Sequence, residues 1–451
     1  MTETRLFGTN GIRGVVNKDL TPNFALRVGV AIGTFMKGTV AVASDTRVSG
    51  DMVRSAVFAG LMYAGCSILD LGVVPTPVLQ YFIKTHPETV GGVMITASHN
   101  PPQFNGIKCV SLDGTEMKRS DEEKIESIFF GGAPETSDVK PGTVEKISGA
   151  AESYVDAVIS KVDASAIRNA GLKAVLDCAN GAAFFTTPLL LKKLNVRTTT
   201  LNADPQGEFP GHPSEPTEEN LKDLISLMRT NGADIGIAHD GDADRTVFVS
   251  DGGKYVSGDK TLALISRSEL KKKTGVVVTP VATSSMVEEV VKEAGGEVLY
   301  TAVGSPVVAR AMMSAGAVFG GEENGGLIFP EMQYCRDGAM AVAKMLESIV
   351  KNGPLAQQIS TLPVYYTYKF KIDCPDGKKK ELLRHLSEEI KDGKKDETDG
   401  LKILFEDGWV LIRPSGTEPI FRVYSESKDE ATAKKRGEEF IAAAANYLKF
   451  I

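Results

Sequence analysis

Short apolar runs alternate with longer amphipathic stretches through the first three quarters of the chain. The apolar runs predict buried strands, at residues 39–43, 67–71, 91–95, 104–110, 172–177, 233–238, 275–279 and 317–320. The amphipathic stretches predict helices, at residues 21–36, 50–64, 120–129, 151–163, 187–194 and 284–294. Thr21 and Pro22 suit the N-cap and first turn of the first helix. Strands that alternate with helices indicate α/β units with mostly parallel sheets.

The pattern starts anew twice, which predicts a threefold internal repeat of one domain type. In each repeat a late strand opens into a polar loop that contains or approaches glycine: GVMITASHN, DIGIAHDGDAD and AVFGGEENGG. A stretch rich in Gly, Pro, Thr and Ser at residues 131–150 is predicted to be a linker. The proline-rich stretch 202–219 is predicted to be a long irregular loop, either functional or mobile.

The pattern changes near Val364. Aromatic residues then alternate as in a strand with one exposed face, and a charged helix follows at 378–390. Strands at 409–412 and 420–424 and a last helix complete the chain, and the lysines at 378–380 and 394–395 are expected on solvated faces. The predicted fold is therefore α/β: three related domains with mixed, mostly parallel sheets and a smaller α+β domain. The predicted boundaries are 1–148, 149–252, 253–364 and 365–451.

Composition excludes several classes of protein. The 451 residues carry a net charge of −7, so nothing resembles the basic footprint of a nucleic-acid-binding protein. Five scattered cysteines, none in a C-x-x-C pair, argue against a disulfide framework and a structural zinc site. Neither a signal peptide nor a membrane-length apolar run is visible, so we expect a cytoplasmic protein without membrane partners. A homo-oligomer is compatible with the sequence.

Ser98 lies in the loop directly after the predicted strand 91–95, and Pro101 and Pro102 direct the chain away from the sheet. Ligands of open α/β sheets bind at the carboxyl ends of the strands. A serine in this position can act as a nucleophile if a neighbouring group activates it. The alternative is an ordinary junction between a strand and a turn.

Asp240, Asp242 and Asp244 alternate along one short loop. Three such carboxylates repel one another unless a cation binds them, and oxygen ligands suit Mg²⁺ or Ca²⁺. An EF-hand would have glycine in place of Arg245 and glutamate in place of Asp251, so Mg²⁺ is favoured. The alternative is a solvated acidic turn.

Other polar loops offer binding groups. Arg413, Ser415, Gly416 and Thr417 match the needs of a phosphate group. Glu322 and Asn324 can bind the hydroxyls of a polyol such as a sugar. Three further candidates are basic: Arg13 in a glycine-rich stretch that is either a surface turn or a ligand contact, Lys108 beside the serine loop, and Arg245. The motifs G-x-x-x-x-G-K-[ST], G-x-S-x-G and H-E-x-x-H are absent.

The ordered motifs TASHNPP, NGIK, DGDADR, GEENGG and RPSGTEP resemble the α-D-phosphohexomutase family over essentially the whole chain. The resemblance implies four domains around a central cleft, closed by the fourth. It also implies a phosphoserine at Ser98, primed by a hexose 1,6-bisphosphate, and Mg²⁺ bound by the three aspartates together with that phosphoserine. Arg13, His99, Lys108 and Arg245 would line the reacting centre. Glu322 and Asn324 would bind the sugar, and residues 413–417 the phosphate that does not react.

The resemblance thus predicts a mutase that interconverts hexose 6-phosphate and 1-phosphate through a bisphosphate. The stretch RLFGTNGIRG looks most like archaeal-type phosphoglucosamine mutases, although enzymes acting on glucose and mannose phosphates look similar. Family members often have Ser where Asn324 stands, which leaves the sugar preference open between glucosamine, glucose and mannose phosphates. Two readings from other classes are a phosphatase that works through a phosphoserine and a sugar-phosphate sensor.

Overall fold

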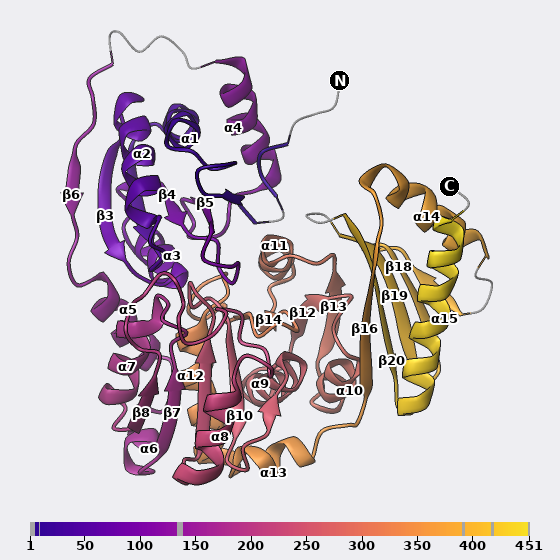
Figure 1. Cartoon of the computed structure of the whole chain (residues 1–451). Coiled ribbons are helices and arrows are strands. Elements are labelled where there is room, and N and C mark those ends of the chain that lie inside the picture. Colours follow the sequence, from indigo (N-terminus) through magenta and orange to yellow (C-terminus); the bar gives the residue numbers. More distant parts are fainter. Residues whose placement is uncertain (1–4, 9, 133–138, 390–392, 416–418, 450–451) are drawn as a thin grey trace. The chain divides into compact units, whose positions relative to one another are not determined.

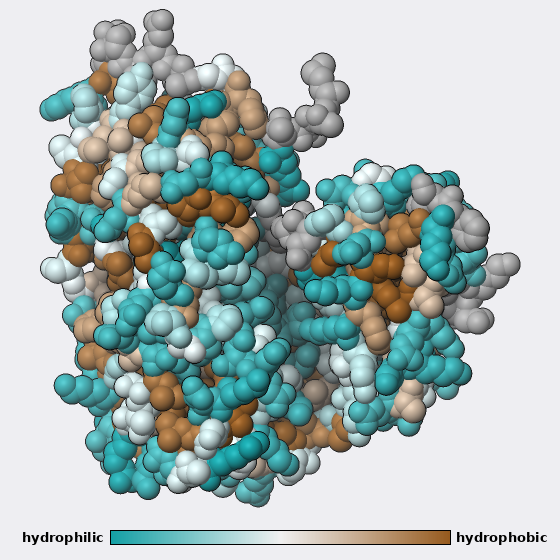
Figure 2. Space-filling model, in the orientation of Figure 1, coloured by the Kyte–Doolittle hydropathy of each residue, from teal (hydrophilic) through white to brown (hydrophobic). Residues whose placement is uncertain are grey.

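A computed structural model describes residues 5–8, 10–132, 139–389, 393–415 and 419–449 of the chain (Figure 1). The chain divides into two compact units, Met1–Thr261 with Asn324–Ser360, and Leu262–Glu323 with Thr361–Ile451. On the face shown in Figure 2, hydrophilic and apolar residues are intermixed. Among the described residues, no helix is both long and apolar enough to cross a membrane.

The first sheet of the first unit carries the serine loop. Its strands, in spatial order, are β1 (Ile12–Val15), β5 (Phe104–Ser111), β4 (Thr89–Ile95), β2 (Thr39–Ser44), β3 (Ser67–Val73) and β6 (Val144–Lys146). Strand β2 pairs in parallel with β3 and β4, whereas β5 is antiparallel to β4. The helices of this region are α1 (Pro22–Met36), α2 (Gly50–Tyr63), α3 (Thr76–Thr85) and α4 (Arg119–Gly131).

Two local features explain how α1 and α2 form and pack. The Thr21 side chain accepts a hydrogen bond from the Phe24 N–H and Pro22 occupies the first turn, which confirms the predicted start of α1. A Cβ atom at Gly60 of α2 would lie 2.3 Å from the carbonyl oxygen of Leu26 in α1. Only glycine therefore allows the two helices to pack at this distance.

The second sheet of the first unit carries the aspartate loop. Its strands, in spatial order, are β11 (Tyr255–Val256), β10 (Thr246–Ser250), β9 (Ile235–His239), β7 (Lys173–Asp177) and β8 (Arg197–Leu201). Strand β7 pairs in parallel with β8 and β9, and β10 is antiparallel to β9. The remaining elements of this region are α5 (Ala150–Ile159), α6 (Ala164–Asn169), α7 (Ala183–Lys193), α8 (Lys222–Asn231), β15 (Leu327–Ile328), α12 (Gly338–Asn352) and α13 (Leu355–Ser360).

The second unit contains a third parallel arrangement and an antiparallel sheet. Strand β12 (Val276–Pro280) pairs in parallel with β13 (Glu297–Thr301) and β14 (Phe319–Gly321). Its helices are α10 (Ser285–Glu293) and α11 (Ser305–Ala315), and α9 (Gly258–Lys272) leads into it from the first unit. The antiparallel sheet has the order β16 (Tyr366–Asp373), β20 (Ile420–Ser427), β19 (Gly408–Pro414), β18 (Leu401–Phe405) and β17 (Lys394–Asp396), with helices α14 (Asp376–Glu389) and α15 (Glu430–Leu448).

The predicted fold class and the threefold repeat are confirmed. In each α/β region the first long parallel strand (β2, β7 or β12) lies between the next two strands of its region. The domain boundaries near residues 148, 252 and 364 stay a prediction. The predicted linker 131–150 is wrong in part, because residues 144–146 form β6 against β3. The predicted helix at 187–194 begins earlier, at Ala183.

Candidate active site

Ser98 is held in an uncommon backbone conformation at the end of β4. Its φ angle is 53°, in the left-handed region that non-glycine residues rarely adopt. Its N–H donates to Thr96 Oγ1 at 2.8 Å, and its side-chain Oγ donates to Asp240 Oδ2 at 2.8 Å. The serine is buried, so these contacts rather than water orient its hydroxyl.

The three aspartates lie in the tight connection between the antiparallel strands β9 and β10. One carboxylate oxygen of each lies within 4.8 Å of the others. Asp242 Oδ2 accepts from Thr76 Oγ1 and from Lys108 Nζ, both at 2.7 Å, and Asp244 Oδ2 accepts from Arg336 at 2.5 Å. The second oxygens of Asp242 and Asp244 are buried and have no hydrogen-bond partner among the described residues. Converging carboxylates with unused buried oxygens fit a divalent cation such as Mg²⁺.

The pKa values of Asp240 and Asp242 are shifted in opposite directions. Burial raises the pKa of Asp240 to about 7, because a buried carboxylate loses its hydration; Asp242 and Asp244 add to this rise and Arg245 opposes it. Burial also acts to raise the pKa of Asp242, but Lys108 and Thr76 outweigh it and hold that pKa below its usual value. A bound divalent cation would favour the charged form of all three carboxylates.

Four basic side chains surround the aspartates and Ser98. The Arg245 guanidinium donates to Asp240 Oδ2 at 3.0 Å and lies 3.4 Å from Ser98 Oγ. Arg13 donates to Asn100 Oδ1 at 2.6 Å. Together with Lys108 and Arg336, these two arginines outnumber the three carboxylates. Four positively charged side chains around a serine hydroxyl are suited to a phosphate group.

His99 contacts both the serine and Arg245. Its Nδ1 lies 3.4 Å from Ser98 Oγ and is hydrogen-bonded to the Arg245 guanidinium. Burial and, after it, the nearby charges of Arg245 and Arg13 lower the pKa of His99 to about 2. The imidazole is therefore neutral at physiological pH.

The structure brings together the predicted reacting-centre residues, which come from four separate segments of the first unit: Arg13, Ser98, His99, Lys108, Asp240, Asp242, Asp244 and Arg245. It does not test their chemical roles. Asn324 also belongs to this unit, and its Oδ1 accepts from the Gly326 N–H at 3.1 Å.

The remaining predicted residues belong to the second unit. Glu322 follows β14 and is buried. Arg413 lies near the end of β19, with its Nε 3.3 Å from Asp399 Oδ2, and the carbonyl of Ser415 accepts from Lys379 Nζ at 2.6 Å. Gly416 and Thr417 lie outside the described residues. The expectation that Lys379 is solvated is wrong, because its ammonium is needed to satisfy that buried carbonyl.

Sequence reasoning missed three residues of the first unit. Arg336, just before α12, contacts Asp244, and Thr76, at the start of α3, contacts Asp242. Neither lies in a recognisable motif. Arg47 donates to the Ser98 carbonyl at 2.8 Å. The polar residues Ser44 to Arg47 follow a strand directly, and this position at a strand's carboxyl end was a usable signal.

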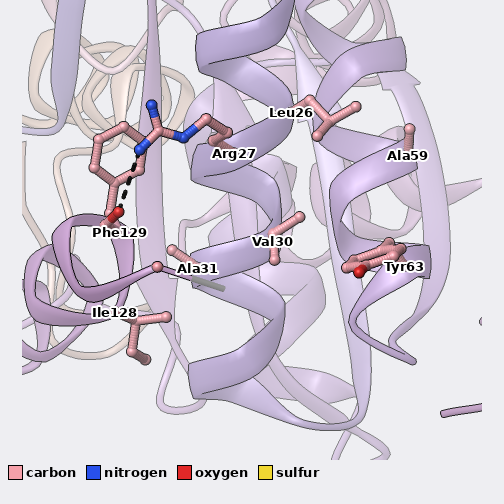
Figure 3. Close-up of a pocket in the computed structure, with 9 residues that line it drawn as sticks. Leu26, Arg27, Val30, Ala31, Ala59, Tyr63, Ile128 and Phe129 are labelled. Carbon is pink, nitrogen blue, oxygen red and sulfur yellow. Dashed lines mark hydrogen bonds between the residues drawn. The ribbon is translucent and has the colours of Figure 1, made fainter. Parts of the chain in front are cut away.

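A cavity lies away from these residues. It has a volume of about 490 Å³ and lies among α1, α2 and α4. Its walls include Leu26, Val30 and Tyr63, and the Arg27 guanidinium lies 4.3 Å from the centre of the Phe129 ring (Figure 3). No residue of the serine or aspartate loops lines it.

Comparison with known proteins identifies the family. Four domain families described as phosphoglucomutase/phosphomannomutase match the chain: the α/β/α domains I, II and III at residues 4–135, 152–253 and 257–366, and the C-terminal domain at residues 370–443. A phosphoglucomutase/phosphomannomutase of Thermococcus kodakarensis is 42% identical over 96% of both chains. A probable phosphoglucosamine mutase of Methanopyrus kandleri is 42% identical over 97% of both chains. A phosphoglucosamine/phosphogalactosamine mutase of Sulfurisphaera tokodaii is 39% identical over 95% of this chain and 96% of its own.

Solved structures agree with these sequence matches. A phosphoglucomutase/phosphomannomutase family protein of Burkholderia thailandensis has a TM-score of 0.88 at 28% identity and covers 97% of this chain and 96% of its own. A putative phosphomannomutase of Thermus thermophilus has a TM-score of 0.84 at 26% identity, over 98% of this chain and 100% of its own. The chain therefore belongs to the phosphoglucomutase/phosphomannomutase family of phosphohexomutases, which are isomerases.

Proposed function

We propose that this protein interconverts the 6-phosphate and 1-phosphate of a hexose through a phosphoserine at Ser98 and a hexose 1,6-bisphosphate. The observation that carries this proposal is the place of Ser98 Oγ, 2.8 Å from Asp240 and 3.4 Å from the Arg245 guanidinium, in a buried cluster of carboxylates and cations. Phosphoryl transfer depends mainly on positioning and on charge stabilisation, and this cluster offers both.

The transfer proceeds in two halves. First the phosphoryl group leaves Ser98 Oγ as the O–P bond breaks, and a new O–P bond forms to the free hydroxyl of the sugar monophosphate. The proton that this hydroxyl gives up is balanced by the proton that returns to Ser98 Oγ. After the bisphosphate turns over, its other phosphoryl group returns to Ser98 and releases the isomeric monophosphate. A starting supply of 1,6-bisphosphate phosphorylates Ser98 for the first cycle.

The residues of the first unit have separable tasks in this scheme. Asp240, Asp242 and Asp244 would hold Mg²⁺, which stabilises the charge of a transferring phosphoryl group. Arg245, Arg13 and Lys108 bind oxygens of the same group, and Arg336, which contacts Asp244, adds a fourth positive charge. His99, neutral at physiological pH, orients Arg245 through its ring nitrogen.

Most of the residues proposed to bind the substrate belong to the second unit. Glu322 and Asn324 are each assigned to sugar hydroxyls, and Arg413 with Ser415, Gly416 and Thr417 to the phosphate that does not react. Exclusion of water from the bound substrate would protect the phosphoenzyme from hydrolysis.

Glucosamine phosphate ranks first among the substrates, with glucose and mannose phosphates next. The N-terminal stretch and the probable phosphoglucosamine mutase of Methanopyrus kandleri support this order. The relative from Sulfurisphaera tokodaii is named for both glucosamine and galactosamine phosphates, which differ at the 4-hydroxyl. Galactosamine phosphate therefore belongs among the sugars to be tested.

The deciding experiment combines turnover with intact mass. Wild type and Ser98→Ala are incubated with Mg²⁺, glucosamine 6-phosphate and a trace of glucosamine 1,6-bisphosphate, and products are followed by ³¹P NMR. We expect the 1-phosphate from wild type only, and a mass excess of one phosphoryl group on wild type only. Release of free phosphate without the 1-phosphate would instead identify a phosphatase. Full turnover by Ser98→Ala would reject the phosphoserine.

A further inference from the structure

Asp45 and Arg47, in the loop that follows β2, are fully enclosed yet have no part in the chemistry proposed above. Both side chains are directed at the serine loop, although that loop is about fifty residues further along the chain. Burying a carboxylate and a guanidinium is costly, so their retention inside the unit calls for a reason beyond packing.

The Arg47 guanidinium donates hydrogen bonds to four main-chain carbonyls in the serine loop. One terminal nitrogen donates to the carbonyl of Ser98 at 2.8 Å and to that of Asn100 at 2.6 Å. The other donates to the carbonyls of Pro101 and Phe104, at 2.7 Å and 2.9 Å. A planar guanidinium with fixed donor directions suits this geometry, whereas a lysine ammonium could not reach both sides.

One carboxylate oxygen of Asp45 binds both side chains that contact the main chain of Ser98. Asp45 Oδ2 accepts from Arg47 Nε at 3.1 Å and from Thr96 Oγ1 at 2.6 Å. Thr96 Oγ1 in turn accepts the N–H of Ser98 at 2.8 Å. Thr96 thus links the N–H of Ser98 to Asp45 Oδ2, and Arg47 links the carbonyl of Ser98 to the same oxygen.

The second α/β region encloses this network. Phe209, from the irregular loop 202–219, covers the Arg47 guanidinium at 5.0 Å. A Cβ atom at Gly207 would lie 2.5 Å from the Arg47 carbonyl carbon, and one at Gly241 would lie 2.5 Å from the carbonyl oxygen of Ser98. These close approaches exclude water from the polar contacts and leave the serine loop little room to relax.

We infer that Asp45, Arg47 and Thr96 form a positioning clamp that holds Ser98 in its left-handed conformation, so that Oγ faces Asp240 for phosphoryl transfer. The inference rests on the proposed function. Because the clamp acts only on the main chain of Ser98, Oγ stays free to accept and release the phosphoryl group. The strained φ of 53° is otherwise without a local reason, since Ser98 is not glycine.

The test uses Thr96→Val, which keeps the shape of the side chain but removes the acceptor for the Ser98 N–H and the donor to Asp45. Thr96→Ser keeps the oxygen and is the conservative variant. Thr89→Val is the matched control: Thr89 is a buried threonine at the opposite end of β4, and its hydroxyl donates to the His86 carbonyl at 2.8 Å. Asp45→Asn is measured alongside, in case Thr96→Val does not fold.

The readouts are the rate of Ser98 phosphorylation by glucosamine 1,6-bisphosphate, followed by intact mass, and the separate kcat and KM for the sugar phosphate. A displaced nucleophile typically costs about a hundredfold. We expect Thr96→Val and Asp45→Asn to lower both kcat and the phosphorylation rate by about ten- to hundredfold, with KM unchanged. Thr96→Ser should restore most of both rates, and Thr89→Val should match wild type.

Three results would overturn the inference. If wild type is phosphorylated at Ser98 and the folded clamp variants are phosphorylated equally fast, the clamp is wrong and the proposed function stands. If Thr96→Val and Thr89→Val lose activity to the same degree, the loss reflects stability rather than positioning. Wild type that takes up no phosphoryl group would remove the proposed function and the clamp with it.

Discussion

Replacing Lys108 with Met tests whether its ammonium holds the aspartate cluster together. Lys108 Nζ lies 2.7 Å from Asp242 and 3.7 Å from Asp244, and none of the three side chains is more than 2% exposed. Removing one member of a buried ion pair typically costs about 3–5 kcal/mol, because the partner charge is left uncompensated. Thr76 still donates to Asp242 in the variant, so we expect a loss near the lower end of that range.

Magnesium should reduce this loss. If Mg²⁺ binds the same carboxylates, it supplies the positive charge that Lys108→Met has removed, and the cost of the substitution becomes smaller than in its absence. Activity should not recover, because the ammonium is also proposed to bind the transferring phosphoryl group. Loss of one such donor typically lowers kcat by about a hundred- to thousandfold.

The assay is urea unfolding followed by far-ultraviolet circular dichroism, in EDTA and in saturating Mg²⁺, with kcat measured in parallel. Lys124→Met is the control, since Lys124 forms an exposed ion pair with Asp121 and is 63% exposed. Exposed pairs contribute about 0–1 kcal/mol, so this variant should unfold like wild type in both buffers. The reasoning fails if Lys108→Met costs no more than Lys124→Met, or if Mg²⁺ leaves its cost unchanged.

Three further predictions concern the metal site, the binding of the phosphate that does not react, and the choice of sugar. Asp242→Asn, which removes a charge and a basic ligand oxygen, should lose most activity with its circular dichroism spectrum intact; normal turnover after chelation of all metal would contradict this. Arg413→Ala should raise KM for the sugar phosphate more than it lowers kcat, and an unchanged KM removes Arg413 from the substrate site. Across the 1-phosphates of glucosamine, N-acetylglucosamine, glucose and mannose, kcat/KM should vary by roughly a power of ten per lost hydrogen bond, because Glu322 and Asn324 are expected to contact hydroxyls that these sugars share. Galactose 1-phosphate and galactosamine 1-phosphate, both inverted at the 4-hydroxyl, should be poor, and equal activity of either would contradict that assignment.

Periodicity along the chain was enough to predict the α/β fold and its repeat. Apolar runs such as 91–95 and 235–238 correspond to buried strands, because a strand enclosed on both faces needs apolar side chains throughout. Strand β8 escaped prediction because it is a threonine-rich edge strand and largely exposed. Strand β6 escaped because its three residues are all exposed and only the neighbouring β3 makes them a strand.

Some residues of the candidate site could likewise be predicted from the sequence, and others could not. Ser98 and the three aspartates could be predicted, because each directly follows an apolar run and chain position alone assigns it to a strand's carboxyl end. Arg336, Thr76 and Arg47 could not be assigned to the site, since their contacts join residues that lie 51 to 166 positions apart. Local periodicity carries no information on such pairs. Only the tertiary contacts between the serine loop and the aspartate loop within the first unit bring the buried charges together, and the cost of leaving any of them unpaired makes that arrangement specific.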